Sequence, residues 1–258
     1  LNFDRSIGIV GTRSATNYGK AITKKIIEDL LPYQPVIISG LAYGIDIEAH
    51  RAALQVGLPT IAIMGSPIDQ IYPAAHKKTA EQLQETGLLI SEYAPGSRMV
   101  PGNFPARNRI IAGLSDALIV VEAAEKGGAL ITAEIAYSYD KDVFAVPGNL
   151  LSTYSEGCNQ LIRKMKASIY TGPGDIAEAL FWTKPGEEKI KKPTLDLSGR
   201  DEEERSILLH LQEKVESEID LISYATEIPL GILSSKLLSL EFEGIVKSLP
   251  GKKFKLMI

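Results

Sequence analysis

Residues 6–31 read SIGIVGTRSATNYGKAITKKIIEDLL, and this stretch sets the pattern that decides the fold. Its first five residues, 6–10, form a short apolar run that is typical of a buried strand. A turn follows at Gly11, and apolar residues then recur at helical spacing: Ile22, Ile26, Ile27, Leu30 and Leu31. The order of strand, glycine turn and helix is the first unit of an α/β domain.

The same order repeats along the first 182 residues. Apolar runs predict strands at 36–39, 60–64, 88–90, 117–121 and 143–146, and helical spacing predicts helices at 45–56, 74–86 and 129–139. Continuous apolar strands separated by helices imply a parallel sheet with both faces covered, because right-handed crossovers place helices on each face. We therefore predict an α/β domain over residues 1–182, with a Rossmann-like, doubly wound and mostly parallel sheet.

A change of composition separates this domain from the end of the chain. Residues 183–200 are rich in Lys, Glu, Pro and Gly and have few large apolar side chains, which predicts a linker. Residues 201–258 contain apolar helical stripes near 207–211, 221–226 and 230–242, followed by a predicted hairpin around Pro250-Gly251. Three helices and a two-stranded wing predict a small C-terminal winged-helix domain.

The presumed recognition helix of this module, residues 230–242, is not basic. It offers Lys236 against Glu241, and residues 198–258 contain eight Lys and Arg against eleven Asp and Glu. A helix that reads the major groove of DNA is normally basic. We expect a protein-contact or regulatory module, which leaves Lys252, Lys253 and Lys255 on the wing as its only candidate patch for DNA.

The composition of the whole chain limits the class of protein. The 258 residues are 45% hydrophobic and 23% charged, as in ordinary globular proteins, and carry a net charge of −4. This acidic balance argues against a general nucleic-acid coat protein, so a polyanion would have to bind in a local groove. Cys158 is the only cysteine, which excludes an intrachain disulfide. With no signal peptide and no apolar run long enough to span a bilayer, we expect a cytoplasmic protein.

A site for phosphates and bases is predicted where a helix begins at residues 104–115, FPARNRIIAGLS. This segment carries an aromatic ring at Phe104, an amide at Asn108, and guanidinium groups at Arg107 and Arg109. Arginine forms forked bonds with phosphate and stacks on bases. Two arginines this close repel each other unless an anion lies between them, so the segment predicts an anionic ligand.

Three glycine-containing turns follow predicted strands and add to this site. They are residues 11–14 (GTRS), 39–46 (SGLAYGID) and 126–129 (KGGA). In an open α/β sheet, ligands bind at the carboxyl ends of the strands, where glycine lets the backbone approach and helix N-termini offer amide donors. Arg13 and Lys126 raise the number of cations near helix N-termini to four, enough to hold several phosphates.

Other kinds of site have less support. The first turn lacks the three-glycine dinucleotide fingerprint, and a Ser-Gly pair replaces the acidic ribose ligand expected after the second strand, which disfavours NAD. Asp46, Glu48 and His50 are expected to cap their helix and pair locally instead of catalysing a reaction. His76 and His210 have no partner at metal-ligand spacing. We expect no metal and no cofactor.

A series of ordered motifs closely resembles those of the bacterial DNA-processing protein A family, also called Smf. The motifs are GTR at 11–13, SGxAxGID at 39–46, FPxRNRII at 104–111, GALITA at 128–133, VPG at 146–148 and GCNQLI at 157–162. They run through the whole predicted Rossmann-like domain. The stretch Met165-Lys166-Ala167 departs from the Gly-Ala that the family usually has at this point.

The resemblance implies a protein that binds single-stranded DNA, protects incoming strands during natural transformation and loads the RecA recombinase on them. It also implies a homodimer without catalytic turnover. Carried over by position, the DNA-binding residues are Thr12, Arg13, Gly40, Phe104, Arg107, Asn108, Arg109, Lys126, Gly127 and Gly128. The four cations would hold phosphates, Phe104 would stack on a base, and the amides of Thr12, Gly40 and Gly128 would add neutral donors. Such binding is independent of sequence and sensitive to salt.

Two other functions stay open at this point. Residues 127–134, GGALITAE, partly resemble the glycine-rich motif of nucleotide phosphoribohydrolases, with the second glycine pair and the threonine displaced. In that alternative, Glu134 and Arg107 would cleave a nucleoside monophosphate. A transcription factor with a ligand-sensing Rossmann-like domain is disfavoured by the acidic balance of the recognition helix.

Overall fold

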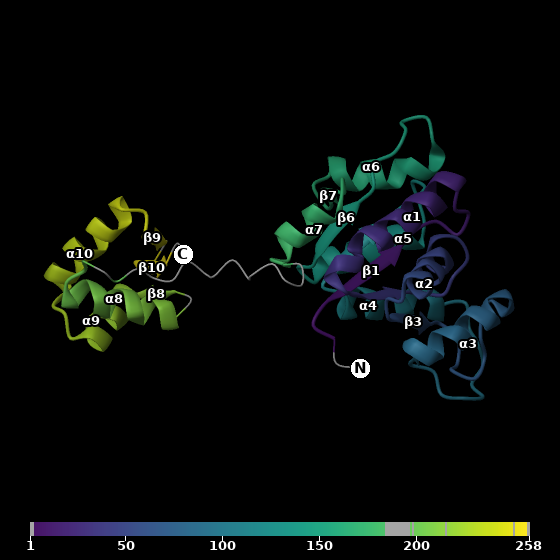
Figure 1. The fold of residues 1–258 in the computed structure, drawn as a ribbon, viewed down its shortest axis with the longest axis horizontal. Helices are drawn as coiled ribbons and strands as arrows, with labels where there is room; N and C mark the ends of the chain where they lie inside the picture. Colours follow the sequence, from purple (N-terminus) through teal and green to yellow (C-terminus); the bar gives the residue numbers. More distant parts are fainter. Residues whose placement is uncertain (1–2, 184–196, 198, 215, 250, 257–258) are drawn as a thin grey trace. The chain divides into compact units, whose positions relative to one another are not determined.

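The computed structural model describes residues 3–183, 197, 199–214, 216–249 and 251–256 (Figure 1). Its internal contacts divide the chain into two compact units, Leu1–Gly186 and Glu187–Ile258. Most of the predicted linker, 183–200, lies outside the described residues. The domain boundaries at 182 and 201 therefore stay a prediction.

A sheet of seven strands forms the centre of the first unit. The strands are β1 (Ser6–Val10), β2 (Val36–Ser39), β3 (Thr60–Met64), β4 (Leu88–Ser91), β5 (Ala117–Val120), β6 (Asp142–Ala145) and β7 (Ser168–Ile169). Their order is β4-β3-β2-β1-β5-β6-β7, and every neighbouring pair is parallel. In chain order, β2, β3 and β4 are added on one side of β1, and β5, β6 and β7 are then added on its other side.

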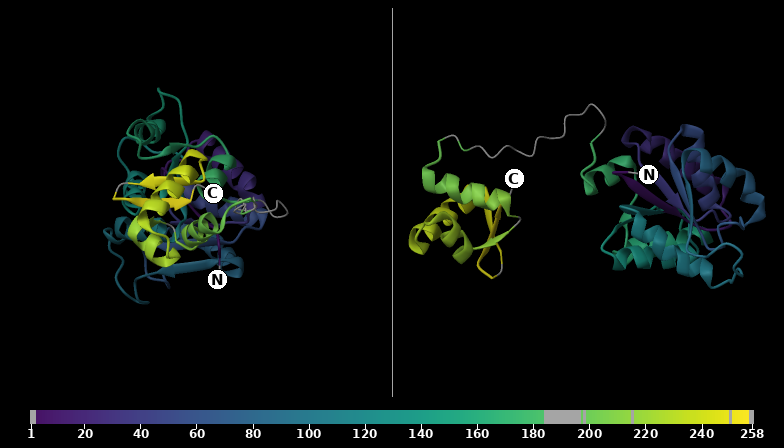
Figure 2. Two further views of the ribbon diagram at one scale, coloured as in Figure 1. Left: turned by 90° about the vertical axis from the view of Figure 1, so that its left-hand side faces the viewer. Right: turned by 90° about the horizontal axis from the view of Figure 1, so that it is seen from below.

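Helices cover both faces of this sheet, as the right panel of Figure 2 shows. One face carries α1 (Asn17–Leu30), α2 (Ile45–Val56) and α7 (Pro173–Ala179), and the other carries α4 (Asn103–Leu114), α5 (Gly128–Ser138) and α6 (Glu156–Arg163). The central strands contribute side chains to the cores on both faces of the sheet, because successive side chains of a strand point to opposite faces. Ile119 of β5 packs into the first core, whereas Leu118 and Val120 pack into the second. The predicted Rossmann-like, doubly wound fold is confirmed.

Some elements differ from the expectation. The predicted helix at 74–86 begins with a 3₁₀ turn, η2 (Ala74–His76), before α3 (Lys77–Thr86). Two further 3₁₀ turns are η1 (Leu31–Tyr33) and η3 (Thr153–Ser155). Strand β7 and helices α6 and α7 were not predicted, since a strand of two residues and helices of eight and seven residues give little periodicity.

A close approach of two turns fixes the carboxyl edge of the sheet. Gly44 has φ +77°, and a Cβ at this position would lie 2.1 Å from the carbonyl oxygen of Thr12. The next residue, Ile45, donates its N–H to that same oxygen at 3.2 Å. Only glycine allows this approach, because other residues rarely adopt such a φ and would clash with the backbone. The turn after β2 is thereby held against the turn after β1.

The second unit has the predicted winged-helix elements. Helices α8 (Glu202–Glu213), α9 (Ile219–Thr226) and α10 (Leu230–Phe242) surround an apolar core that includes Leu208, Ile222 and Leu237. Strands β9 (Val246–Leu249) and β10 (Lys253–Leu256) form the hairpin. A third short strand, β8 (Ser217–Glu218), pairs with β10 and extends the predicted two-stranded wing to three strands.

Candidate functional site

A cleft of about 770 Å³ opens where β1 and β5 lie side by side. The chain adds strands in opposite directions from these two, so the loops that follow them turn away from each other and leave a crevice. The cleft is lined by the turn after β1, the loop after β5, and the first turns of α4 and α5. Its volume is within the range of small-ligand sites.

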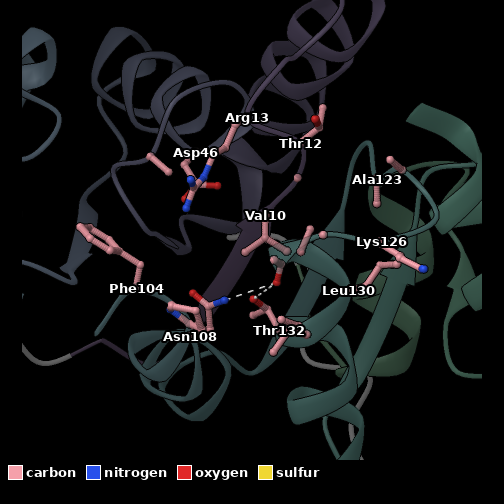
Figure 3. A pocket seen from close by; sticks show the side chains of 18 of the residues that line it. Val10, Thr12, Arg13, Asp46, Phe104, Asn108, Ala123, Lys126, Leu130 and Thr132 are labelled. Carbon is pink, nitrogen blue, oxygen red and sulfur yellow. Dashed lines mark hydrogen bonds between the residues drawn. The ribbon is translucent and has the colours of Figure 1, made fainter. Parts of the chain in front are cut away.

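Two exposed cations stand on opposite sides of this cleft. Figure 3 shows Arg13, with Asp46, on one side and Lys126 on the other. Within the part of the chain that the structure describes, neither Arg13 nor Lys126 belongs to a salt bridge. Gly127 and Gly128 follow Lys126 and are exposed at the start of α5. The first backbone N–H groups of a helix have no partner within it, so this end can receive a phosphate oxygen.

Arg107 forms the floor of the cleft and is buried, with 4% of its surface exposed. Its Nη1 donates to the carbonyl oxygen of Gly40 at 2.6 Å and to that of Ile63, and its Nε donates to Oδ1 of Asn108 at 3.3 Å. These bonds join α4 to the ends of β2 and β3. The protein itself therefore occupies much of this guanidinium, and its contact with phosphate stays a prediction.

Asp46 is the buried anion beside Arg107. Its Oδ2 accepts the N–H of Gly40 at 3.1 Å, and 7% of its surface is exposed. Burial raises the pKa of Asp46 and lowers the pKa of Arg107, while the attraction between the two charges opposes both shifts. The sequence pattern did not reveal this arrangement, because nothing in the spacing of Gly40, Asp46 and Arg107 indicates that they meet.

Arg109 does not belong to the cleft. It is exposed, forms a salt bridge with Glu92 and is absent from the residues that line the cleft. Arg107 and Arg109 point to different sides, as residues two apart on a helix do, and a contact of Arg109 with DNA stays a prediction. The repulsion argument fails for the same reason.

Two of the three expected amide donors are already engaged. The N–H of Thr12 donates to the carbonyl oxygen of Glu122 at 2.7 Å, and that of Gly40 donates to Asp46. These two N–H groups thus have partners within the protein, and the contact of Thr12 and Gly40 with DNA stays a prediction. The amide of Gly128 lies in the first turn of α5 and stays a candidate.

Phe104 and Asn108 occupy the α4 wall of the cleft. Phe104 is partly buried and packs on Gly65, where a Cβ would lie 2.6 Å from its Cδ1. Asn108 donates from Nδ2 to the carbonyl oxygen of Gly128 at 3.3 Å, which links α4 to the start of α5 (Figure 3). Phe104 and Asn108 therefore lie at the cleft, and their contacts with DNA stay predictions.

His50 lies buried beneath this site. Its Nδ1 is 2.7 Å from Oγ1 of Thr60, which itself donates to the carbonyl oxygen of Ile37. Nδ1 is therefore the protonated nitrogen, and the buried Nε2 has no partner among the described residues. Burial lowers the pKa of His50 to about 3, with smaller contributions from the charges of Arg107 and His76. His50 serves as a neutral core residue, and its neighbour Glu48 pairs locally with Arg51.

The phosphoribohydrolase alternative gains no support from the geometry. Glu134 borders the cleft, but its Oε2 accepts a hydrogen bond from Nζ of Lys166 at 2.6 Å. Arg107, its supposed partner, is held by backbone carbonyl groups. Among the described residues there is also no group of three His, Cys, Asp or Glu side chains that could hold a metal ion. The same residues include no helix with both the length and the apolar character needed to cross a membrane.

The charge of α10 in the second unit is neutralised within that unit. Lys236 forms salt bridges with Asp201 and Glu204, and Lys253 on the hairpin is 2.6 Å from Glu216. In contrast, α10 exposes apolar side chains, of which Phe242 is 84% exposed. This surface is consistent with the predicted protein-contact role, which stays a prediction.

Comparison with known proteins gives matches over both units. A family model described as DNA recombination-mediator protein A matches residues 1–181, and a model of the DprA winged helix domain matches residues 191–252. Protein Smf of Synechocystis sp. is 37% identical over 96% of this chain and 69% of its own length. DNA processing protein DprA of Streptococcus pneumoniae is 43% identical over 68% of this chain and 62% of its own length. The chain thus spans between three fifths and seven tenths of these two relatives.

A solved structure adds a relative with a stated ligand. DNA processing protein A from Helicobacter pylori, described for its unique single-stranded DNA binding mode, matches with a TM-score of 0.63 and 33% identity. The match covers 69% of this chain and 81% of that one.

The buried His50 predicts that acid destabilises the first unit. Its imidazole is neutral in the folded protein, whereas in the unfolded chain it takes up a proton near pH 6.5. The stability that it contributes is fully present above this pH and is lost as the pH falls toward about 3. Between pH 7.5 and 5.5 the loss should be about 1.4 kcal/mol. Urea unfolding, followed by the fluorescence of Trp182, measures it in this unit.

The comparison uses two variants. His50→Phe removes the titrating group and should reduce the pH dependence by this amount, whereas His210→Gln in the second unit should leave the Trp182 transition unchanged. Equal pH dependence in the wild type and His50→Phe would contradict the assignment.

Proposed function

The chain belongs to the DNA recombination-mediator protein A family, and from this premise we propose that it binds single-stranded DNA in the cleft between β1 and β5. The observation that carries the proposal is a pair of cations, Arg13 and Lys126, that have no salt-bridge partner among the described residues and lie across a cleft that also receives the N-terminus of α5. The single-stranded DNA binding described for the Helicobacter pylori relative supports it.

The residues divide into three roles. Arg13 and Lys126 hold phosphates, and the N–H of Gly128 donates to a phosphate oxygen near Lys126. Phe104 stacks on a base, and a base can reach it only when it is unpaired. None of these contacts reads a base edge, so the strand is bound without sequence preference.

We also propose that the protein acts by binding and not by turnover. Arg107 and Glu134, which the phosphoribohydrolase alternative requires, are each engaged by other groups of the protein. The arginine and glutamate that this alternative needs are therefore not free to act together on a nucleotide in the cleft.

The family resemblance further leads us to propose that the protein works as a homodimer in the cytoplasm. It protects incoming strands there and loads the RecA recombinase on them during natural transformation and recombination. The role in recombination agrees with the description of the family model.

Strand binding is tested by a fluorescence-anisotropy titration at two salt concentrations. A mixed-sequence single strand should bind, whereas its duplex and a nucleoside monophosphate should bind much more weakly. Two neutralised phosphates predict a slope of about −1.4 in log affinity against log salt. Hydrolysis of the monophosphate without binding of the strand would favour the enzyme alternative.

The variant Arg13→Ala tests whether DNA binding is weakened while the stability of the fold is unchanged. The variant should bind every single strand more weakly, with a salt slope that is smaller by about 0.7, because one phosphate contact is lost. Its urea unfolding should match that of the wild type, since Arg13 is exposed. Arg163→Ala, which removes an exposed arginine at the end of α6, is the matched control and should change neither property. Unchanged affinity of Arg13→Ala at moderate salt would refute the assignment.

RecA loading is tested by the rate at which RecA assembles on a labelled single strand. The rate should rise when this protein is present, and the rise should be smaller with Arg13→Ala because less protein occupies the strand. An unchanged rate on a strand that the protein demonstrably covers would remove the loading role and leave strand binding intact.

A further inference from the structure

Three aromatic rings line a small cavity on the Arg13 side of the cleft. They belong to Tyr43, Tyr72 and Phe104, and the guanidinium-bearing residues Arg13 and Arg107 also line it, together with Gly40, Ala42 and Pro73. Tyr43 lies in the turn after β2, Tyr72 in the loop after β3, and Phe104 at the start of α4, which follows β4. Because β2, β3 and β4 are neighbours in the sheet, their carboxyl ends bring the three rings together.

Packing holds these rings in place. Tyr43 contacts His76 edge to face, with ring centroids 4.8 Å apart, and the buried His76 is fixed by its Nδ1 beside a backbone carbonyl oxygen. Tyr72 and Phe104 have centroids 5.3 Å apart, and Phe104 rests on Gly65. Rings that are already ordered lose little conformational entropy when a ligand binds.

The two tyrosines nevertheless leave about half of their surface in water. Tyr43 is 50% exposed and Tyr72 is 48% exposed, and both lie beside the exposed guanidinium of Arg13. Ordered aromatic faces next to a cation form the usual platform for an unpaired base and its phosphate.

We propose that Tyr43 and Tyr72 form a stacking subsite for an unpaired base, next to the base on Phe104. This inference rests on the proposed function and adds a second contact to the same strand. The cavity has a volume of about 40 Å³, room for a water molecule and not for a base. The base therefore lies across the mouth of the cavity, against the exposed tyrosine faces. Arg13 lines both this cavity and the main cleft, so it holds the phosphate that connects the two parts of the strand.

The test measures the affinity of the wild type and of each variant for two kinds of strand. Tyr43→Ala, Tyr72→Ala and the double variant are titrated with an intact single strand and with one whose nucleotides lack bases. Each single variant should bind the intact strand about five-fold more weakly or worse. All proteins should bind the abasic strand equally. The salt slope should not change, because stacking releases no counterion from phosphate.

Three controls keep the result specific. Tyr139→Ala removes a tyrosine of similar exposure, 47%, at the far end of α5 and should bind like the wild type. Tyr43→Phe and Tyr72→Phe keep the ring and should keep the affinity. Trp182 fluorescence shows whether each variant is folded. With wild-type protein, a strand that carries 2-aminopurine should lose fluorescence on binding, which tests stacking even where a variant does not fold.

The outcomes separate the subsite from the proposed function. A wild type that binds the intact strand, together with alanine variants of equal affinity, would overturn the subsite alone. Equal weakening on the intact and abasic strands, or unquenched 2-aminopurine, would also overturn it. A wild type that binds neither strand would overturn the proposed function and the subsite with it.

Discussion

The arrangement of this protein depends on the reversal of strand order at β1. The sheet grows through β2, β3 and β4 on one side of β1 and through β5, β6 and β7 on the other. The loops after β1 and β5 must therefore diverge, and the crevice between them is a consequence of connectivity and not of any particular side chain. The side chains that line the crevice determine which kind of ligand it can bind. Arg13 and Lys126 come from those two diverging loops, so the topology itself separates the two cations across the cleft.

A buried charge pair then fixes the shape of this edge. Arg107 donates to carbonyl groups at the ends of β2 and β3, and Asp46 accepts the amide of Gly40 between them. The two charges attract each other, and each is also held by hydrogen bonds to backbone groups. The chain thus uses its most buried arginine to hold backbone in place, whereas Arg13 is exposed at the cleft. This division explains how a site can carry several arginines without presenting them all to one anion.

The sequence predicted the fold better than the site. Long apolar strands such as 60–64 and amphipathic helices such as 45–56 carry a periodic signal, whereas the two residues of β7 and of β8 carry none. Of the residues that the motifs proposed for DNA binding, Arg13, Lys126 and Phe104 line the cleft, and their contact with DNA stays a prediction. Arg109 points away from Arg107, because a helix rotates between residues i and i+2, and sequence proximity alone does not show this. The motifs also could not show that the amides of Thr12 and Gly40 have partners, since Glu122 and Asp46 reach them only in the folded chain.

The overall charge of the protein explains why aromatic rings matter at this cleft. A chain with a net charge of −4 does not attract a polyanion over long distances, and some of its cations, such as Arg109 and Lys236, are paired with carboxylates. Two cations can neutralise few phosphates, so electrostatics alone would give weak binding. Stacking adds about 1–3 kcal/mol per base and needs no net charge. A base that is paired in a duplex cannot make this stacking contact. An acidic protein with a few cations beside exposed rings is therefore suited to hold a single strand while releasing duplex, which a uniformly basic surface would also bind.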